Sequence, residues 1–330
     1  MTRLLIYAPS LAAVAAEIDA RAPGLDILIM DEAGVITLRG QVVSADDAAP
    51  DIVWADHRAF LGSASRMFAS TMLKSPALKW VQSAAAGFDH PIFQQIVSKD
   101  AGLSISHGQA VGISDYVLWG VLDHFQRGPG WREDQSAKVW RPRPFREVNG
   151  SNWLIIGFGA IGQAVATRAR AFGASITGVR RNQTAHALAD RIGSLANLPD
   201  LLPTADVVVL SSPLNAETRQ LAGPDFFAAM KPRSVLVNVG RGGLVDEAAL
   251  LAALDAGVPE HALLDVFQTE PLPAESPFWS HPGVSLTPHS SGITGGQDIR
   301  NAALFLDNLS RFVAGQPPLN LADPKDVLGG

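Results

Sequence analysis

The segment most informative about the fold is residues 152–174, NWLIIGFGAIGQAVATRARAFGA, in which glycines separate an apolar run from an alanine-rich run. The apolar run predicts a buried strand, the alanine-rich run predicts a helix, and the glycines mark a tight turn between them. A strand that passes directly into a helix is the first half of a crossover to a parallel neighbour. The segment therefore favours an α/β fold.

Short apolar runs alternate with helical stretches along most of the chain. In the second half the strand-like runs are residues 152–157, 175–179, 206–212, 234–240, 262–267 and 284–289, and in the first part they are 4–8, 26–30, 51–55 and 77–87. Alternation of this kind predicts parallel, doubly wound sheets. A chain of 330 residues can bury one or two full cores, so we expect two domains.

Two helical segments suggest where the domains divide. Residues 113–125 carry apolar residues at helical spacing, and the Pro/Gly-rich segment that follows leads into the second unit. The last helical segment, residues 295–315, is amphipathic. We expect it to pack back on the first unit, which makes that domain discontinuous.

Composition excludes several classes of function. The sequence contains no run near the roughly 18 apolar residues that cross a bilayer, so no membrane partner is expected. It contains no cysteine, which rules out disulfides and cysteine metal sites and fits a cytoplasmic protein; no metal site is expected. The formal net charge of −6 disfavours nucleic acid as the main partner.

Two segments leave alternatives open. The N-terminus, with Arg3 ahead of an apolar run, has features of a secretory leader, but Pro9 and Ser10 interrupt that run. A strand followed by a helix explains it equally well. The arginine-rich segment 127–146 contains interleaved tryptophans, and we interpret it as a solvated or subunit-contacting loop rather than as a nucleic-acid site.

Gly157, Gly159 and Gly162 form the pattern G-x-G-x-x-G between the predicted strand and helix. The first glycine makes the turn, the second lets the main chain approach a pyrophosphate, and the third lets the helix pack closely on the strand. The pyrophosphate would lie at the positive N-terminal end of the helix, beside Ala160 and Ile161. A glycine turn needed for steric reasons alone is the alternative, and the context favours dinucleotide binding.

Arg180 and Arg181 follow the second strand of this unit, about 20 residues beyond the glycines. In this fold that place usually carries an acid that binds the 2′-hydroxyl of the adenosine ribose, and an acid would repel a 2′-phosphate. Guanidinium groups bind phosphate with charge-assisted, often bidentate hydrogen bonds. We therefore predict NADP(H) as the preferred cofactor, with NAD(H) as a second option. A solvated turn is the alternative for the arginine pair.

Charged residues also lie within or after strand-like runs of the second half, where ligands bind to open α/β sheets. They are Arg241 between glycines, Asp265 inside an apolar run, Glu270 before a proline, and His289. Taken singly, His289 is more often a structural histidine and Glu270 a loop acid. Taken together beside a nicotinamide site, a cation, an acid and a proton carrier indicate catalysis.

These motifs resemble the D-isomer-specific 2-hydroxyacid dehydrogenase family over nearly the whole chain, through GFGAIG, SSPLNAETRQL, MKPRSVLVNVGRGGLVDEAAL, LLDVFQTEPLP and LTPHSSGIT, in this order. Within the family, LKWVQSAAAGFDHP is most similar to the glyoxylate/hydroxypyruvate reductase branch. The resemblance implies two Rossmann- or flavodoxin-like domains with parallel sheets: a dinucleotide-binding domain, residues 111–294, inserted into a substrate domain, residues 1–110 and 295–330. It also implies an active site in the cleft between them and a homodimer formed through the cofactor domain.

The resemblance assigns catalytic roles. Arg241 would hold the carboxylate of a small 2-keto acid and polarise its keto oxygen, and His289 would protonate that oxygen during reduction. Glu270 would orient His289 and favour its imidazolium form. Hydride transfer from the nicotinamide would then give a D-2-hydroxy acid from glyoxylate or hydroxypyruvate. A related formate-oxidising group has glutamine in place of Glu270, so the sequence points away from formate.

The resemblance also assigns binding residues. Asp265 would bind the carboxamide of the nicotinamide, and the other cofactor contacts would be Ser211, Pro213, Thr218 and Val239. Main-chain amides near Ala86 and Gly87 would receive the substrate carboxylate, because small residues let the main chain come close. Trp54 is either a wall of the substrate pocket or a core residue.

The sequence departs from the family pattern in two places. Ser114 and Asp115 stand where the family commonly has Ala-Glu, and two serines follow His289 where it often has an apolar residue. The serines can alter hydrogen bonding around the nicotinamide, but neither departure removes a catalytic group. Two other functions stay open: reduction of a bulkier 2-keto acid, and a nucleotide-sensing corepressor that binds protein partners.

Overall fold

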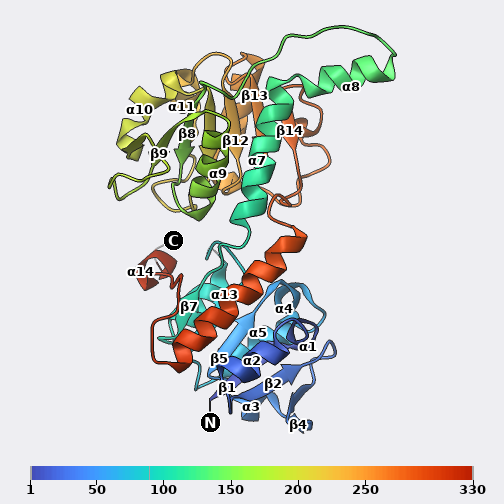
Figure 1. The fold of residues 1–330 in the computed structure, drawn as a ribbon, viewed down its shortest axis with the longest axis vertical. Coiled ribbons are helices and arrows are strands. Elements are labelled where there is room, and N and C mark those ends of the chain that lie inside the picture. Colours follow the sequence, from blue (N-terminus) through green and yellow to red (C-terminus); the bar gives the residue numbers. More distant parts are fainter. Residues whose placement is uncertain (1, 89, 329–330) are drawn as a thin grey trace. The chain divides into compact units, whose positions relative to one another are not determined.

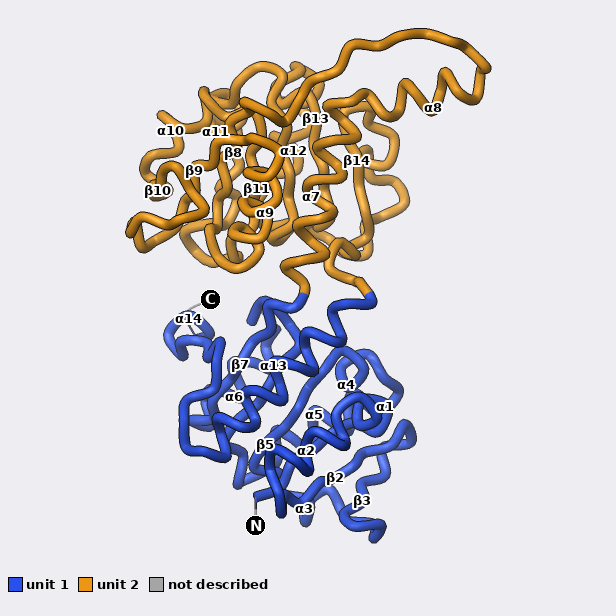
Figure 2. The backbone as a smooth tube through the Cα atoms, viewed as in Figure 1, with its two compact units in different colours: residues 1–108, 295–330 blue, residues 109–294 orange. Residues whose placement is uncertain are grey.

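The computed structural model describes residues 2–88 and 90–328, and its chain divides into two compact units (Figure 2). Unit 1 comprises Met1–Gly108 and Gly295–Gly330, and unit 2 comprises Gln109–Thr294. The sequence predicts these boundaries at residues 110 and 294.

Unit 1 is built on one sheet in the order β4-β3-β2-β1-β5-β6-β7 (Figure 1). Its strands are β1 Arg3–Tyr7, β2 Asp26–Met30, β3 Ile36–Leu38, β4 Gln41–Val43, β5 Ile52–Ala55, β6 Trp80–Ser83 and β7 Gly102–Ser104. All neighbours pair in parallel except β2, β3 and β4, which form an antiparallel edge. The turn from β3 to β4 contains Arg39 and Gly40 at φ of 51° and 80°, the geometry of a tight hairpin turn. The sequence does not predict this hairpin, because a strand of three residues is too short to show the alternation of apolar and polar residues that identifies a strand.

The helices of unit 1 are α1 Ala8–Leu11, α2 Ala15–Arg21, α3 Ala45–Ala48, α4 His57–Leu61, α5 Ser65–Lys74, α6 Pro91–Val97, α13 Gly295–Val313 and α14 Pro324–Leu328. Successive side chains of β1 point to opposite faces of the sheet, so Leu5 lies in one core cluster and Leu4 and Ile6 lie in the other. Phe305 and Leu309 of α13 are fully buried in this second cluster. The C-terminal helix therefore completes the core of unit 1.

Unit 2 is an all-parallel sheet in the order β10-β9-β8-β11-β12-β13-β14 (Figure 1). Its strands are β8 Asn152–Ile156, β9 Ser175–Val179, β10 Arg191–Gly193, β11 Val207–Leu210, β12 Val235–Asn238, β13 His261–Leu264 and β14 Val284–Leu286. This is the order of doubly wound dinucleotide-binding sheets. The order reverses between β8 and β11, and ligands bind to such sheets at the carboxyl ends of the strands beside that point.

Helices cover both faces of this sheet. They are α7 Ala110–Phe125, α8 Gly128–Ser136, α9 Ala160–Ala171, α10 Leu198–Leu201, α11 Pro224–Ala229 and α12 Glu247–Asp255, with the 3-10 helices η1 Leu195–Asn197, η2 Leu202–Thr204, η3 Gly242–Leu244 and η4 Pro277–Trp279. Trp153 and Ile155 of β8 pack in one core cluster, and Leu154 and Ile156 pack in the other. Burial on both faces explains why the central strands β8, β11, β12 and β13 are mostly apolar in the sequence.

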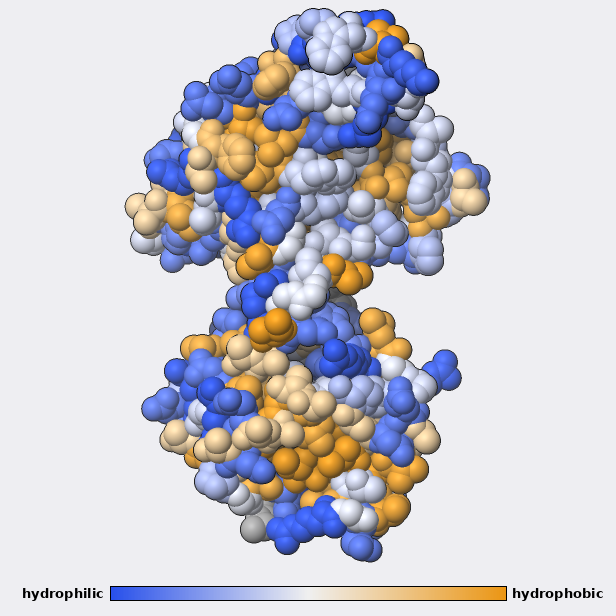
Figure 3. All heavy atoms as spheres, turned by 45° about the vertical axis from the view of Figure 1, so that its right-hand side comes forward, coloured by the Kyte–Doolittle hydropathy of each residue, from blue (hydrophilic) through white to orange (hydrophobic). Residues whose placement is uncertain are grey.

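One segment of unit 2, residues 127–146, projects from the rest of the unit and contains α8 (Figures 1 and 2). We call it the arm. Elsewhere the visible surface intermixes hydrophilic and hydrophobic residues (Figure 3). In residues 2–88 and 90–328, no helix is both long and apolar enough to cross a membrane.

Candidate active site

The glycine turn of unit 2 joins β8 to α9. Gly157 has φ of 95°, and a Cβ atom there would lie 2.3 Å from the main-chain N of Ser212. A Cβ atom at Gly162 would lie 2.4 Å from the carbonyl oxygen of Gly157, so close main-chain packing requires both glycines. A Cβ atom at Gly159 would meet no described atom within 4 Å. Packing does not require Gly159, and its lack of a side chain leaves the N-terminus of α9 open to an anionic ligand.

A cavity of about 740 Å³ lies beside this turn and is lined by Arg180 and Arg181, which follow β9. Arg180 Nη2 donates to the carbonyl oxygen of Thr184 at 2.6 Å. The Nε of Arg180 is buried and has no hydrogen-bond partner in the described part of the chain. A buried donor without a partner is costly, and a phosphate oxygen would satisfy it. The cavity therefore fits the adenosine end of a phosphorylated dinucleotide.

The loop after β11 contains a residue that the sequence analysis missed. Ser211, named from the sequence, donates its hydroxyl to the carbonyl oxygen of Gly157 at 2.8 Å. Ser212 lines the cavity, and its buried Oγ has no partner among the described residues. Pro213 and Thr218 also line the cavity. The sequence shows two adjacent serines, but only the path of the main chain decides which one faces the cavity.

Arg241 follows β12 and precedes η3. Its Nη1 donates to the carbonyl oxygen of Gly240 at 2.8 Å, and Asn238 Nδ2 donates to the carbonyl oxygen of Arg241 at 3.0 Å. A Cβ atom at Gly242 would lie 1.9 Å from the carbonyl carbon of Phe267. The loop after β12 therefore lies directly on the loop after β13, and this contact tolerates only glycine at position 242.

His289 and Glu270 are brought together although they lie in different loops. His289 Nδ1 is 2.7 Å from Glu270 Oε2, and the other carboxylate oxygen accepts the main-chain N–H of Phe267 at 2.9 Å. The side chain of His289 is half-exposed. Because Nδ1 is bound to Glu270, Nε2 is the ring nitrogen available to exchange a proton with a ligand.

Asp265 lies after β13 and is only 2% exposed. Its carboxylate accepts hydrogen bonds from Thr287 Oγ1 at 2.6 Å, from the main-chain N–H of Ser290 at 2.8 Å, and from both the main chain and the hydroxyl of Ser291. The main-chain N–H of His289 donates to the carbonyl oxygen of Asp265 at 2.8 Å. Asp265 therefore binds the loop that carries His289. The two serines that depart from the family pattern both contribute to this contact.

The remaining residues named from the sequence have mixed surroundings. Val239 follows β12 and is buried in the core of unit 2. In unit 1, Ala86 and Gly87 follow β6 and are partly exposed. Trp54, at 3% exposure, stacks on Phe305 with ring centroids 4.5 Å apart, and it also lines a cavity of about 580 Å³ within unit 1. Trp54 therefore packs in the core of unit 1 and also lines this cavity.

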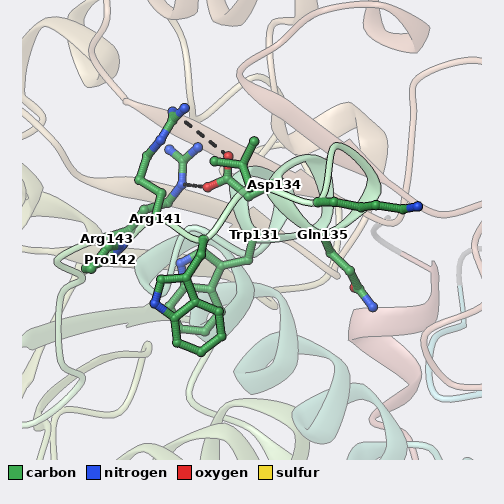
Figure 4. Close-up of a pocket in the computed structure, with 9 residues that line it drawn as sticks. Trp131, Asp134, Gln135, Arg141, Pro142 and Arg143 are labelled. Atoms are coloured by element: carbon green, nitrogen blue, oxygen red, sulfur yellow. Dashed lines mark hydrogen bonds and ion pairs between the residues drawn. The ribbon is translucent and has the colours of Figure 1, made fainter.

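The arm of unit 2 forms another cavity, of about 870 Å³ (Figure 4). Arg143 Nε donates to Asp134 Oδ2 at 2.6 Å, and Arg141 lies 3.9 Å from the same carboxylate. The hydrogen bond from Arg143 lowers the pKa of Asp134. Two arginines of the arm are therefore paired with an acid of the arm itself, which does not favour a nucleic-acid site. Trp140, in contrast, is 98% exposed.

Comparison with known sequences extends over most of the chain. Residues 118–291 match the family described as D-isomer specific 2-hydroxyacid dehydrogenase, NAD binding domain. Glyoxylate/hydroxypyruvate reductase B of Yersinia enterocolitica is 30% identical over 298 residues, which cover 85% of this chain and 89% of that protein. Glyoxylate reductase of Thermococcus kodakarensis is 33% identical over 265 residues, which cover 77% of this chain and 79% of that protein.

Two solved structures are similar over both units. A D-isomer specific 2-hydroxyacid dehydrogenase from Xanthobacter autotrophicus Py2, in complex with NADPH and MES, has a TM-score of 0.77 at 28% identity and covers 99% of each chain. The NADPH-dependent glyoxylate/hydroxypyruvate reductase of Sinorhizobium meliloti, in complex with NADP and sulfate, has a TM-score of 0.76 at 25% identity and covers 100% of each chain.

Proposed function

Because the chain belongs to the D-isomer-specific 2-hydroxyacid dehydrogenase family, we propose that it reduces a small 2-keto acid, of the glyoxylate or hydroxypyruvate type, to the D-2-hydroxy acid with NADPH. The observation that carries this proposal is the hydrogen bond between His289 and Glu270 in the unit that contains the glycine turn. A protein that only senses a nucleotide does not need an oriented proton carrier. The names of the relatives support the substrate class.

Reduction of the keto group requires a proton for the keto oxygen and a positive group that stabilises the negative charge developing on that oxygen. Glu270 holds Nδ1 of His289, so the proton that goes to the keto oxygen leaves from Nε2. Arg241 binds the substrate carboxylate and stabilises the negative charge that develops on the keto oxygen. NADPH, when bound, supplies the hydride to the carbonyl carbon. In the reverse direction, neutral His289 takes the proton from the hydroxyl group.

The preference for NADPH follows from the cavity beside the glycine turn. The first turn of α9, with the main chain of Ala160, Ile161 and Gly162, would hold the pyrophosphate. Arg180, with its buried and unpaired Nε, and the neighbouring Arg181 would hold the 2′-phosphate of the ribose. The relatives solved with NADPH or NADP support this assignment. The carboxylate-binding role of Ala86 and Gly87 stays a prediction, as does a cytoplasmic location.

We also propose a homodimer in which the arm of unit 2 contacts a second copy of the chain. On this projecting segment, Trp140 is 98% exposed, Phe145 is 50% exposed and Val139 is 40% exposed. Large exposed apolar groups are uncommon on monomers when they gather in one place, and aromatic residues are enriched in protein interfaces.

Assays with a panel of 2-keto acids test the proposed activity. Glyoxylate, hydroxypyruvate, pyruvate and phenylpyruvate are each supplied with NADPH and, separately, with NADH, and cofactor oxidation is followed by absorbance. We expect turnover with glyoxylate and hydroxypyruvate when NADPH is the cofactor. Preference for phenylpyruvate would indicate a bulkier substrate. If neither cofactor is oxidised with any of these acids, the proposed activity is wrong and the protein only binds a nucleotide.

A further inference from the structure

Asn238 is the last residue of β12, and its side chain is buried in the turn that leads to Arg241. Its Oδ1 accepts the main-chain N–H of Gly240 at 3.1 Å, and its Nδ2 donates to the carbonyl oxygen of Arg241 at 3.0 Å. An N–H group only donates and a carbonyl oxygen only accepts, so these partners fix which end of the amide faces which group. One carboxamide therefore joins the main chain on both sides of the peptide bond between Gly240 and Arg241.

The guanidinium of Arg241 is bonded to that same peptide unit. Its Nη1 donates to the carbonyl oxygen of Gly240 at 2.8 Å, and this carbonyl lies between the two main-chain groups that Asn238 holds. An arginine side chain has several rotatable bonds, so a fixed main-chain support restricts where its charge can lie. A tilt of the peptide unit at Gly240 would move the guanidinium with it.

The two ends of the turn have main-chain support of their own. The main-chain N–H of Val239 donates to the last residue of β11 at 3.1 Å, and that of Leu244 donates to the carbonyl oxygen of Arg241 at 3.1 Å as η3 begins. Gly240, between them, is buried, and its N–H is held by the side chain of Asn238. A buried N–H group needs an acceptor. Loss of the carboxamide would therefore release the middle of the turn while its ends stay in place.

We propose that Asn238 is a positioning residue whose carboxamide fixes the main chain at Gly240 and Arg241, so that the guanidinium is directed at the carboxylate of the keto acid. The inference rests on the proposed function, because that function gives Arg241 the substrate carboxylate. Asn238 acts through Arg241, since both ends of its amide are bonded to main chain. Its loss should therefore impair the use of the keto acid and leave the binding of NADPH unchanged.

Three variants of Asn238 separate its two contacts. Asn238→Leu keeps a similar volume and removes both hydrogen bonds without introducing a charge, and Asn238→Ala removes them with a smaller side chain. In Asn238→Ser the hydroxyl can still accept the N–H of Gly240, two residues further on, but it is too short to reach the carbonyl oxygen of Arg241. This mildest variant carries the test if the other two do not fold.

Asn308 of unit 1 offers a matched control. It is completely buried, its Oδ1 accepts the main-chain N–H of Leu319 at 2.6 Å, and its Nδ2 donates to the carbonyl oxygen of Leu319 at 3.1 Å. Asn308→Leu and Asn308→Ala thus remove the same kinds of hydrogen bond from a loop that contains no residue of the proposed mechanism. They show what the loss of any buried asparagine does to the protein.

Each protein is examined without cofactor by hydrogen–deuterium exchange of residues 238–245, and then by titration with NADPH and by steady-state kinetics with glyoxylate. In Asn238→Leu and Asn238→Ala we expect exchange to be about tenfold faster and kcat/KM about tenfold lower, the change that loss of a hydrogen bond to a buried partner produces. Asn238→Ser should keep the exchange of the wild-type protein and lose about threefold in kcat/KM. The Kd for NADPH should stay within about twofold in all three.

The Asn308 variants should melt at a lower temperature but keep the exchange of residues 238–245 and the kcat/KM of the wild-type protein. An equal loss of kcat/KM in these variants would overturn the assignment, because any buried amide would then have the same effect. So would wild-type exchange and kcat/KM in the variants of Asn238, or a Kd for NADPH that rises as much as kcat/KM falls. If the wild-type protein reduces no 2-keto acid, the proposed function fails, whereas the exchange experiment still decides whether Asn238 holds the turn.

Discussion

Glu270 holds His289 with one carboxylate oxygen, at 2.7 Å, while its other oxygen is fixed by the main chain of Phe267 at 2.9 Å. The carboxylate therefore cannot turn away from the imidazole without losing a second hydrogen bond. This arrangement leaves Nε2 as the ring nitrogen that can exchange a proton with a ligand.

Glu270→Gln should lower kcat by about 100-fold, within the range that general acid–base catalysis contributes. The amide can keep the contact with Phe267, but it supplies no negative charge to the imidazolium of His289. Initial rates with glyoxylate and NADPH measure the effect, and a melting temperature close to that of the wild-type protein shows that the fold is kept. A kcat within threefold of wild type would show that the pairing of Glu270 with His289 does not contribute to the reaction.

Replacing both Arg180 and Arg181 by serine should raise the KM for NADPH at least about tenfold relative to that for NADH, because hydrogen bonds between charged groups contribute about 1.5–3 kcal/mol each. Kinetics with both cofactors measure the ratio. Arg21→Ser, which removes a charge from an exposed ion pair in unit 1, is the control. An unchanged ratio would mean that the two arginines form a solvated turn.

The glycines of the turn should respond differently to alanine. Gly159→Ala should fold normally, because its Cβ atom meets no described atom within 4 Å, but it should bind NADPH at least about tenfold more weakly, since the methyl group takes the place of the pyrophosphate. Gly157→Ala should unfold at a lower temperature, because its Cβ atom would lie 2.3 Å from the main chain of Ser212. Thermal melts and NADPH titrations separate the two effects. Equal NADPH affinity in Gly159→Ala and wild type would contradict the placement of the pyrophosphate.

Trp140→Ser should shift the protein from a two-chain to a one-chain mass in sedimentation velocity. The indole is 98% exposed on the arm, and aromatic residues of this kind carry much of the binding energy of interfaces. Leu61→Ser, at an 84% exposed leucine of unit 1, should leave the mass unchanged. A wild-type protein that sediments with the mass of one chain would contradict the proposed dimer.

Stability should fall below neutral pH because of two stacked histidines in unit 2. The rings of His124 and His261 lie 4.4 Å apart, and burial lowers the pKa of both, that of His261 from 6.5 to about 3. The unfolded chain therefore binds the proton first. The stability contributed by neutral His261 is present above pH 6.5 and is lost as the pH falls from 6.5 towards 3.

Between pH 7 and pH 5.5, this linkage should remove about 1 kcal/mol of the free energy of unfolding for His261 alone. Urea unfolding at the two pH values measures the loss. His261→Gln should be less stable at pH 7, because the stacked ring is lost, but its stability should fall less between the two values. An equal fall in both proteins would show that His261 does not titrate in this range.

The parts of the structure that the sequence predicts are those encoded locally. The glycine turn, the strands of unit 2 other than β10, and the charged residues at strand ends can be read from short segments, because a buried parallel strand is a continuous apolar run and a ligand site lies where such a run ends. The sequence does not predict β10, Arg191–Gly193, which has three residues and begins with an exposed arginine. The long amphipathic helix α13 is also visible from its spacing, and its place in unit 1 follows from the apolar side that it must bury.

Features that depend on distant segments are not predictable in this way. The motif predicts that Asp265 binds the cofactor, and that remains a prediction; its hydrogen bonds with Thr287 and Ser291, 22 and 26 residues further along the chain, are visible only in the structure. Ser211 and Ser212 are chemically identical in the sequence, and the turn of the main chain decides their roles. The β3–β4 hairpin depends on Arg39 in a left-handed conformation, which its residue type does not suggest.

The contact between Gly242 and the main chain of Phe267 has a consequence for laboratory evolution of the substrate range. Because a single carbon atom at position 242 would overlap the main chain of Phe267, position 242 can change only if the loop that contains Phe267 moves with it. A library that randomises one loop and leaves the other unchanged would consist mostly of chains in which Arg241 is displaced from the loop that carries Glu270. Diversity introduced in other loops, with Gly242 retained, would leave this pair intact.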